Sequence, residues 1–468
     1  MLKKNQEFVN TVSYLGANGE GILKQDGIIV FVPFVLVGEK IRYKILKVTS
    51  KCAYGKVLEV LTPAEERVRP KCPVFGKCGG CQLQHLSYTH QLKSKEENVR
   101  NCFKKIAGLD VAVSPTVRCT NEYGYRNKLQ LPVSETENGT VIGFFAENTH
   151  RVIPIDGCPI NPGWTSGIIS AFYDYIKEYD LKGYNETDFS GDIREITVKE
   201  IKDNLIITVV VTNENLCGID YLVKMITDKV KRNFSLYLNV NNGKNNVIYG
   251  DEFILKHGKP TYTGDMRGIK YKIGVQSFMQ VNNEICAKLY STVVDMVNAD
   301  QNTTVIDAYS GAGLMTAMLA RSAKKAIGIE VVKEAVACAD ELKNVNGLTD
   351  KMTNILGKCE EIMPSLIKEE RAKGSKLCLV LDPPRKGLDQ NVINAVIDSG
   401  IEKIVYVSCK PSTLARDVGL ITGSLELVGN EVKKSANPSH RYEVTAVKPF
   451  DMFPQTKHVE TLVLLYKN

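Results

Sequence analysis

The pattern of apolar and polar positions divides the chain into three parts, and the first part covers residues 1–60. Short apolar runs at residues 28–32 (IIVFV), 41–48 (IRYKILKV) and 55–61 (GKVLEVL) are separated by glycine and other turn residues. Strands that recur at a spacing of roughly ten residues between such turns predict a small β-barrel or sandwich. In residues 41–48 the alternation places basic side chains on one face of the strand.

The second part, residues 61–262, has the pattern of an α+β domain. A proline-punctuated, cysteine-rich linker at residues 61–91 precedes an amphipathic helix at 92–107, which we expect to pack on the C-terminal part of the chain. Several apolar runs then predict strands, and residues 166–179 and 218–232 predict helices. The predicted strands are KLQLPV (128–133), VIGFFA (141–146), EITVKE (195–200), NLIITVVVT (204–212) and FSLYLNV (234–240).

In the third part, residues 263–468, strands and helices alternate. The apolar runs that predict strands are TTVIDAYS (303–310), AKKAIGIE (323–330), KLCLVLDPP (376–384) and EKIVYVSC (402–409). Strand–helix alternation predicts βαβ units around a parallel sheet, which is the Rossmann-like arrangement. The expected fold class is therefore a multidomain α/β protein.

The composition is that of an ordinary globular protein. Among 468 residues, 43% are hydrophobic and 24% are charged, which excludes wholesale disorder, collagen and a disulfide-stapled mini-protein. No apolar run approaches the ~20 residues of a membrane span, and the N-terminus has no apolar signal-peptide core. The 13 cysteines, an odd number, fit a reducing compartment. We expect a cytoplasmic protein without membrane contact, whose cysteines are free, catalytic or metal-bound.

The positive charge is concentrated near the N-terminus. The net charge is +7, and residues 1–110 contain 18 basic and 10 acidic side chains, so that the remaining residues are nearly neutral. A basic segment on a neutral body is typical of a region that binds a polyanion such as nucleic acid. A solvated, lysine-rich surface explains the same count, and the charge alone does not separate the two interpretations.

Acidic residues follow three of the predicted parallel strands. Asp307 precedes a Gly311-x-Gly313 turn, Glu330 ends the next strand, and Asp382 follows a third. Such strand ends meet at one crevice, where an acid can accept hydrogen bonds from ribose hydroxyls. Both NAD enzymes and S-adenosylmethionine (SAM) methyltransferases have this layout. Thr316 stands where the dinucleotide fingerprint requires a third glycine, which favours the methyltransferase.

A cysteine and a glutamate supply a candidate catalytic pair. Cys409 follows another apolar strand directly after Ser408, and Glu460 begins the last one. Carbon 5 of a pyrimidine is a poor nucleophile until a thiolate adds to carbon 6, and the product is released only after a base removes the carbon 5 proton. A core cysteine and a surface carboxylate are the alternative interpretations, which spacing does not exclude.

These motifs together resemble the family of RNA uracil-5-methyltransferases. SFMQVN (277–282), DAYSGAG, GIE, DPPRKGL, VSCKPSTLARD and HVETLVLL occur in the order that the family has. The resemblance implies that Cys409 is the nucleophile and Glu460 the base. The residues that it assigns to SAM are Gln280, Tyr309, Glu330 and Asp382.

Two positions depart from the family pattern, and one further segment resembles a known module. Ser310 replaces the usual cysteine of the DxYCG turn, and Lys410 replaces the asparagine of SCNP. Lys410 adds a cation beside Cys409 that lowers the pKa of the thiol or meets RNA phosphate. Residues 1–60 resemble the TRAM domain, an OB-like barrel of RNA-modifying enzymes, which implies a groove for single-stranded RNA.

Four cysteines form a candidate metal site. Three thiols in the pattern C-x5-C-x2-C, followed far downstream by a fourth, suit zinc or an iron–sulfur cluster, and spacing alone does not choose between them. The resemblance to rRNA-directed members, which have C-x5-CGGC, implies a structural 4Fe-4S cluster. The proposed ligands are Cys72, Cys78, Cys81 and Cys158.

The leading hypothesis is the formation of 5-methyluridine in 23S rRNA by a monomeric enzyme. The alternatives are the T-loop uridine of tRNA, an RNA cytosine-5 methylation, and a catalytically silent RNA-binding or assembly protein. Because carbon 5 is inaccessible in stacked RNA, the uridine must be extruded or lie in a loop. Phe278 then fills the vacated stack or packs in the core, and Arg126 contacts phosphate or supports the fold.

Overall fold

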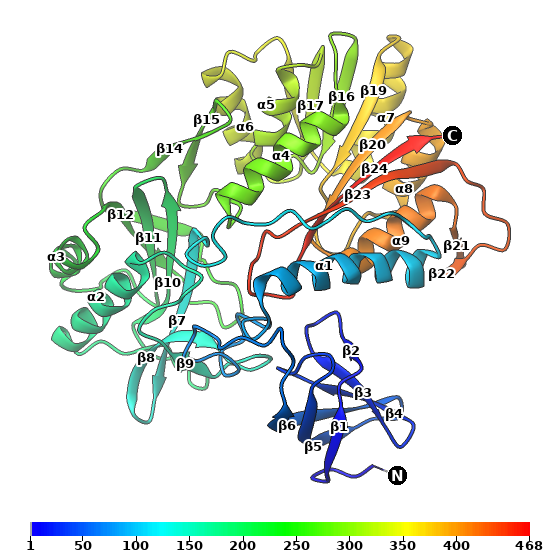
Figure 1. The fold of residues 1–468 in the computed structure, drawn as a ribbon. Helices are drawn as coiled ribbons and strands as arrows, with labels where there is room; N and C mark the ends of the chain where they lie inside the picture. The colour runs from blue at the N-terminus through cyan, green and yellow to red at the C-terminus, as the bar shows by residue number, and fades with distance from the viewer. Residues whose placement is uncertain (1) are drawn as a thin grey trace. The chain divides into compact units, whose positions relative to one another are not determined.

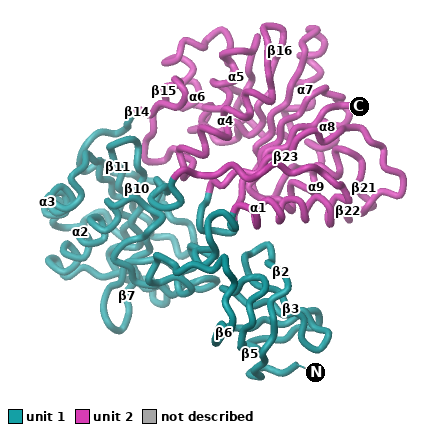
Figure 2. The backbone as a smooth tube through the Cα atoms, viewed as in Figure 1, with its two compact units in different colours: residues 1–91, 121–262, 453–457 teal, residues 92–120, 263–452, 458–468 magenta. Residues whose placement is uncertain are grey.

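The computed structural model describes residues 2–468, which form two compact units (Figure 2). Unit 1 contains residues 1–91, 121–262 and 453–457, and unit 2 contains the remaining segments, 92–120, 263–452 and 458–468. One of the passages of the chain from unit 1 to unit 2 falls between Tyr262 and Thr263. No helix among the described residues has both the length and the apolar character of a membrane span.

The N-terminal part of unit 1 is a six-stranded sheet with the order β1-β5-β6-β4-β3-β2 (Figure 1). Its strands are β1 (Glu7–Thr11), β2 (Tyr14–Leu15), β3 (Gly21–Gln25), β4 (Ile28–Val32), β5 (Lys40–Val48) and β6 (Cys52–Thr62). Ile41, Tyr43 and Ile45 are buried and alternate along β5 with Arg42 and Lys44, so the predicted basic face is confirmed. Every second residue of the strand points into a common core, and the burial of these apolar side chains stabilises the sheet.

The second sheet of unit 1 has seven strands in the order β13-β12-β11-β10-β7-β8-β9. They are β7 (Lys128–Thr136), β8 (Gly139–Phe145), β9 (Val152–Pro154), β10 (Ile193–Ile201), β11 (Asn204–Val211), β12 (Asn233–Val240) and β13 (Glu252–His257). Helices α2 (Trp164–Glu178) and α3 (Ile219–Val230) share a hydrophobic core with this sheet. The predicted strands and helices of this part are therefore confirmed.

Unit 2 is built on a seven-stranded sheet with the order β18-β17-β16-β19-β20-β24-β23. Its first five strands are parallel, and β24 and β23 complete it in antiparallel pairing. The strands are β16 (Thr303–Ala308), β17 (Lys325–Glu330), β18 (Met352–Leu356), β19 (Lys376–Leu381), β20 (Lys403–Ser408), β23 (Tyr442–Phe450) and β24 (Glu460–Lys467). This mixed α/β arrangement confirms the Rossmann-like expectation. The strand order reverses between β16 and β19, which run parallel to each other, and ligands bind at such a switch point.

Six helices belong to the sheet of unit 2. They are α4 (Asn283–Val297), α5 (Leu314–Ala320), α6 (Lys333–Val345), α7 (Cys359–Ala372), α8 (Gln390–Ser399) and α9 (Pro411–Thr422). Two hairpins, β14 (Thr261–Met266) with β15 (Ile269–Gly274) and β21 (Leu425–Val428) with β22 (Glu431–Lys434), lie outside the main sheets.

The amphipathic helix expected at residues 92–107 begins earlier and ends irregularly. It consists of α1 (Tyr88–Cys102) and a π-helical turn, η1 (Phe103–Ala107), which ends at Gly108 with a φ of 69°. Val99, Phe103 and Ala107 are buried in the hydrophobic core of unit 2. The apolar face of this helix therefore packs within unit 2, as expected from its amphipathic pattern.

Candidate active site

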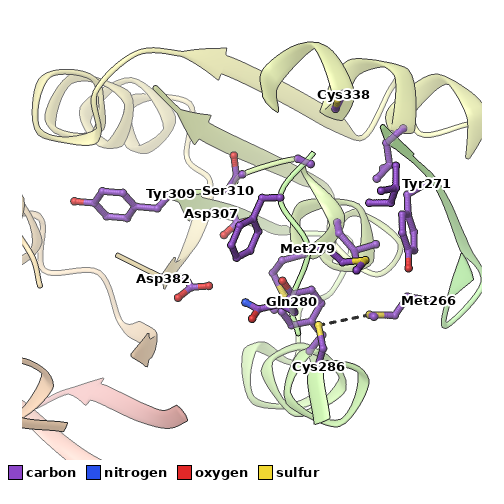
Figure 3. A pocket seen from close by; sticks show the side chains of 18 of the residues that line it. Met266, Tyr271, Met279, Gln280, Cys286, Asp307, Tyr309, Ser310, Cys338 and Asp382 are labelled. Carbon is purple, nitrogen blue, oxygen red and sulfur yellow. Dashed lines mark hydrogen bonds between the residues drawn. The ribbon is translucent and has the colours of Figure 1, made fainter. Parts of the chain in front are cut away.

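A pocket in unit 2 opens at the carboxyl ends of β16 and β19, at the switch point of the sheet. Asp307 and Tyr309 reach it from the end of β16, Asp382 from the end of β19, and Gln280 from the segment before α4. Figure 3 shows the carboxylate of Asp382 and the amide of Gln280 turned toward the same space. Its apolar lining includes Met266, Met279, Leu314, Met315 and Leu342.

The turn after β16 brings backbone to this pocket. Tyr309 and Gly311 have φ values of 66° and 55°, and nothing lies within 4 Å of the position that a Cβ of Gly311 would take. A Cβ on Gly313, by contrast, would lie 2.7 Å from Cβ of Ala339 and 2.8 Å from Cε of Met352. Gly313 therefore allows α5 to start close against its neighbours, while Gly311 leaves open space for a ligand.

Glu330 holds this turn in place. Its carboxylate accepts hydrogen bonds from the backbone N–H groups of Gly311, Val331 and Val332, each at 2.9 Å. Glu330 ends β17, as the sequence indicated, but is not among the pocket-lining residues. Its contact with a ribose stays a prediction. The assignment of Tyr309 to SAM also stays a prediction; this residue lines the pocket, and its side chain packs partly against the hydrophobic core of unit 2.

The carboxyl groups of Asp307, which is buried, and Asp382, which is partly buried, line the pocket. Burial raises the pKa of Asp307 to about 7, although Thr316 Oγ1 donates a hydrogen bond to it at 2.6 Å. Burial also raises the pKa of Asp382 to about 7. Because these groups ionise more readily beside a positive charge, the pocket favours a ligand that carries one.

The strand pairing brings Cys409 and Glu460 together. In the antiparallel pair of β20 and β24, Ser408 faces Thr461, so Cys409 and Glu460 come next in the same register. Glu460 is only 6% exposed. Burial, together with the charge of Asp382, raises its pKa to about 8, while Arg385 opposes the shift. A carboxyl with such a pKa is suited to accept a proton near neutral pH.

Cys409 is half-buried beside two acids and one arginine. Burial, followed by the charge of Glu460, raises the pKa of its thiol, and the charge and hydrogen bond of Arg385 lower it. The sequence left two roles for Lys410, lowering the pKa of this thiol or meeting RNA phosphate. Lys410 is exposed, its backbone N–H donates to Ser408 Oγ, and the cation that lowers the pKa of the thiol is Arg385, so the contact of Lys410 with phosphate stays a prediction. The signal for Arg385 was present in the DPPR motif, where only the aspartate was singled out.

The structure decides between alternatives at two further positions. Phe278 lies at the pocket and is 73% exposed, so the interpretation that it packs in the core is wrong. Arg126 donates from Nε to the carbonyl of Lys128 at 3.1 Å, which supports its interpretation as a fold element in unit 1.

Of the four candidate metal-binding cysteines of unit 1, Cys78, Cys81 and Cys158 each have a pKa that neighbouring cysteines of the set help to raise. Burial raises the pKa of Cys81 to about 12 and that of Cys158 to about 11, and the neighbouring thiols contribute to both shifts. The backbone N–H of Gly80 donates to Sγ of Cys78 at 3.3 Å. Within residues 2–468, however, no three His, Cys, Asp or Glu side chains are arranged to hold a metal ion. The metal site therefore stays a prediction.

Comparisons with known proteins connect this geometry to a family. The model of the tRNA (uracil-5-)-methyltransferase family matches residues 87–468. An uncharacterized RNA methyltransferase of Clostridium acetobutylicum is 38% identical over 99% of this chain and 98% of its own length. Another, of Enterococcus faecalis, is 36% identical over 100% of this chain and 98% of its own length.

A solved structure has the same fold. The tRNA (uracil-54, C5)-methyltransferase of Pyrococcus abyssi, in complex with S-adenosyl-L-homocysteine, matches with a TM-score of 0.75. The match covers 98% of this chain and 100% of that chain at 24% sequence identity. This likeness extends over both units and supports the mixed α/β methyltransferase fold.

Proposed function

The chain belongs to the tRNA (uracil-5-)-methyltransferase family of SAM-dependent RNA methyltransferases, and we propose that it forms 5-methyluridine in 23S rRNA. One observation supports this proposal most strongly: Cys409 and Glu460 lie next to each other at the paired ends of β20 and β24. Asp382 and Arg385 lie close enough to both to influence their pKa values. A thiol, a buried base and a cation together are what pyrimidine C5 chemistry requires.

Gln280, Tyr309, Glu330 and Asp382 are the residues that we assign to SAM, which supplies an electrophilic methyl group when it is bound. The donor set fits this ligand because the raised pKa values of Asp307 and Asp382 favour a cationic partner, and SAM carries a sulfonium and an ammonium group. The open space at Gly311 allows close approach to the backbone.

Cys409 begins the reaction. Its thiolate adds to carbon 6 of the uracil, and the electron pair of the 5,6 double bond moves to form an enolate at carbon 4. Carbon 5 would then take the methyl group from bound SAM, whose S–CH3 bond would break with its electron pair going to sulfur to leave S-adenosyl-L-homocysteine. This step restores the carbonyl and leaves the base saturated and bound to Cys409. Arg385 supports this step because its positive charge lowers the pKa of the thiol and compensates the carboxylates around it.

Glu460 ends the reaction. Its carboxylate removes the proton from carbon 5, the double bond reforms between carbons 5 and 6, and the bond to sulfur breaks to return the Cys409 thiolate. A buried carboxyl with a pKa of about 8 is a stronger base than an exposed glutamate. Phe278, exposed at the pocket, is positioned to replace the extruded uridine in the base stack.

The choice of 23S rRNA rests on the cysteine motif, which resembles that of rRNA-directed members of the family. We propose that Cys72, Cys78, Cys81 and Cys158 hold a structural 4Fe-4S cluster, since all four ligands are thiols and the reaction has no redox step. Their mutual influence on pKa and the N–H donor at Gly80 fit a sulfur-rich centre. Zinc is the alternative occupant.

The basic face of residues 1–60 is proposed to hold RNA in an OB-like, TRAM-type barrel. Lys44 and Lys47 lie on β5, and no ion pair involves either of them within the described part of the chain. Arg42, in contrast, is paired with Glu7 and Glu59, so that much of its charge is already compensated.

The second candidate function is methylation of the T-loop uridine of tRNA. It is favoured by the description of the family as tRNA methyltransferases and by the tRNA enzyme of Pyrococcus abyssi that has the same fold. RNA cytosine-5 methylation and a silent RNA-binding role are weaker, because Glu460 and Cys409 together suit uracil and indicate an active site.

Mapping of 5-methyluridine in 23S rRNA and tRNA from a deletion strain tests the proposal. We expect the modification to disappear from 23S rRNA and to return when the intact gene is supplied. Loss from tRNA alone would establish the second candidate. Unchanged 5-methyluridine in both RNAs, with purified protein inactive on total RNA from the deletion strain, would contradict the activity itself.

A further inference from the structure

A buried ion pair joins α1 to the turn that follows β23 in unit 2. Nζ of Lys95 lies 2.5 Å from Oδ1 of Asp451, and the two side chains are 2% and 0% exposed. Oδ2 of Asp451 is also buried and has no hydrogen-bond partner among the described residues. Neither residue lines the pocket, and the proposed reaction uses neither.

Stability alone is a poor explanation for this pair. Moving two charges out of water costs several kcal/mol per ion, and their attraction offsets this cost only where the remaining polar atoms are also satisfied. Because apolar side chains of similar size are often at least as stabilising in such places, a role in fixing local geometry is the better explanation.

Asp451 stands next to the residue that faces Glu460. Phe450 pairs with Glu460 across β23 and β24, and Asp451 follows Phe450 directly. The backbone N–H of Asp451 donates to the carbonyl of Val117 at 2.9 Å, and that of Val117 donates to the carbonyl of Pro449 at 2.8 Å. Lys95 therefore holds the end of the strand against which Glu460 lies.

The same turn is tied to the segment that contains Gln280. Nδ2 of Asn282 donates to the carbonyl of Met452 at 3.4 Å. Oδ1 of Asn282 accepts from the backbone N–H of Ile285, so this side chain also caps the start of α4. The turn at residues 451–452 thus connects α1, the start of α4 and the strand end opposite Glu460.

We propose that Lys95 and Asp451 are positioning residues that orient Glu460 toward the carbon 5 proton, an inference that rests on the proposed role of Glu460 as the base. The pair fixes the end of β23 that faces Glu460, whereas Cys409 follows β20, which lies on the other side of β24. Its loss therefore slows proton removal and release of the RNA more than methyl transfer. A displacement of the order of 1 Å lowers a rate by up to about 100-fold, so we expect release to slow by 10- to 100-fold.

The test uses the full-length protein with Lys95→Met and Asp451→Leu combined, which removes both charges and keeps an apolar contact. Asp451→Asn, which keeps the shape of the carboxylate, is the second variant. Each is mixed with methyl-labelled SAM and total RNA from the deletion strain, and methyl transfer, protein–RNA adduct and released RNA are followed in a single turnover. We expect nearly normal methyl transfer and SAM affinity, with an adduct that persists 10- to 100-fold longer.

The matched control is Lys373→Met combined with Glu370→Leu, which removes a lysine–glutamate pair with a separation of 2.9 Å at the end of α7. It should leave the lifetime of the adduct unchanged. Equal slowing of methyl transfer and release in the Lys95 and Asp451 variants, or release at the normal rate, would overturn the inference. If the double variant does not fold, the rate of RNA release relative to the rate of methyl transfer in Asp451→Asn tests the positioning role instead.

Glu460→Gln separates this inference from the proposed function. If Glu460→Gln itself forms no adduct, Glu460 is not the base and the proposed function fails. If Glu460→Gln traps the adduct and the Lys95 and Asp451 variants release RNA normally, only the positioning role fails.

Discussion

The two candidate sites of this molecule are built in different ways. In unit 2, Cys409, Glu460 and Asp382 stand at the ends of paired strands, so the hydrogen-bonded register of the sheet places them. In unit 1, Cys72, Cys78 and Cys81 lie in a segment without helices or extended strands, where short turns and single side-chain bonds place them. A site held by a sheet can be complete without its ligand, whereas a site in a loop depends more on what it binds.

The pKa values of the ionisable groups also differ between the two sites. Burial raises the pKa of Glu460 to about 8 and leaves it near the range in which a base works. Burial raises the pKa of Cys81 to about 12, so that the thiol is protonated at neutral pH unless a metal replaces the proton. Burial therefore keeps Glu460 close to its ionisation range at neutral pH and holds the Cys81 thiol in its protonated form.

Replacing the nucleophile gives the largest expected effect and tests the first half of this comparison. Cys409→Ala should lower methylation by at least about 10⁴-fold, because no other group supplies the covalent step. SAM affinity and the melting temperature should stay close to those of the parent protein, since the register of β20 and β24 does not need the thiol. Cys102→Ala, at another half-buried cysteine of unit 2, is the control. Normal turnover in Cys409→Ala would remove the nucleophile assignment.

Replacing the base should stop the reaction at a later stage. With Glu460→Gln, attack on carbon 6 and methyl transfer proceed, but the carbon 5 proton stays, so methylated RNA remains bound to Cys409. A denaturing gel with labelled RNA should show a slow, protease-sensitive band, and we expect turnover to fall by about 10³-fold. The band should be absent with Cys409→Ala, which is the matched control. Turnover without an adduct would return Glu460 to a structural role.

The sequence predicted more of the candidate active site of unit 2 than of the cysteine site of unit 1. Strand ends in a parallel sheet meet at one edge whatever the loops do, so apolar runs ending in Asp307, Asp382 and Cys409 were enough to place these residues together. The Lys95–Asp451 pair was not predictable in this way, because its members are 356 positions apart and neither belongs to a motif. Only the folded chain brings them into contact.

The sequence also did not predict which side chains are exposed or which cation lies beside Cys409. The apolar character of Phe278 fits a core position as well as a surface one, and only the structure shows it 73% exposed. The cation nearest in sequence to Cys409 is Lys410, but the backbone directs Lys410 to solvent and brings Arg385 to the thiol. Sequence neighbours predict contacts well within regular elements and poorly at their ends.

Removing one ligand tests whether the cysteine loop depends on what it binds. The protein purified without oxygen should be brown and contain about four irons per chain, and Cys81→Ser should lose colour and iron. Because metal binding is coupled to folding, Cys81→Ser should melt at a lower temperature, with SAM affinity unchanged. Cys217→Ser, at an exposed cysteine of the same unit, should keep the iron. Stoichiometric zinc without iron would show that the site holds zinc instead.

The raised pKa of Glu460 predicts how activity and stability depend on pH. The base must be ionised, so release of methylated RNA should become slower as pH falls through about 8, by up to tenfold per unit. The folded protein keeps a proton on Glu460 that the unfolded chain loses above its ordinary pKa of 4.5, so this contribution to the free energy of unfolding falls between pH 4.5 and about 8. Glu460→Gln should reduce that dependence, as denaturant unfolding at several pH values would show. An unchanged dependence would contradict the assigned pKa.

The smallest expected effect concerns the basic face of residues 1–60, which supplies binding without chemistry. Combining Lys44→Gln with Lys47→Gln removes two cations from β5. Each phosphate contact with single-stranded RNA contributes roughly −0.7 to the slope of log affinity against log salt, so losing both contacts should flatten that slope by about 1.4. SAM affinity should not change, because no cofactor residue lies in this sheet. Lys24→Gln, on β3, is the matched control for loss of one charge elsewhere in the same sheet. An unaltered slope in the double variant would mean that other residues bind the RNA phosphates, and that Lys44 and Lys47 are solvated surface charges without a role in RNA binding.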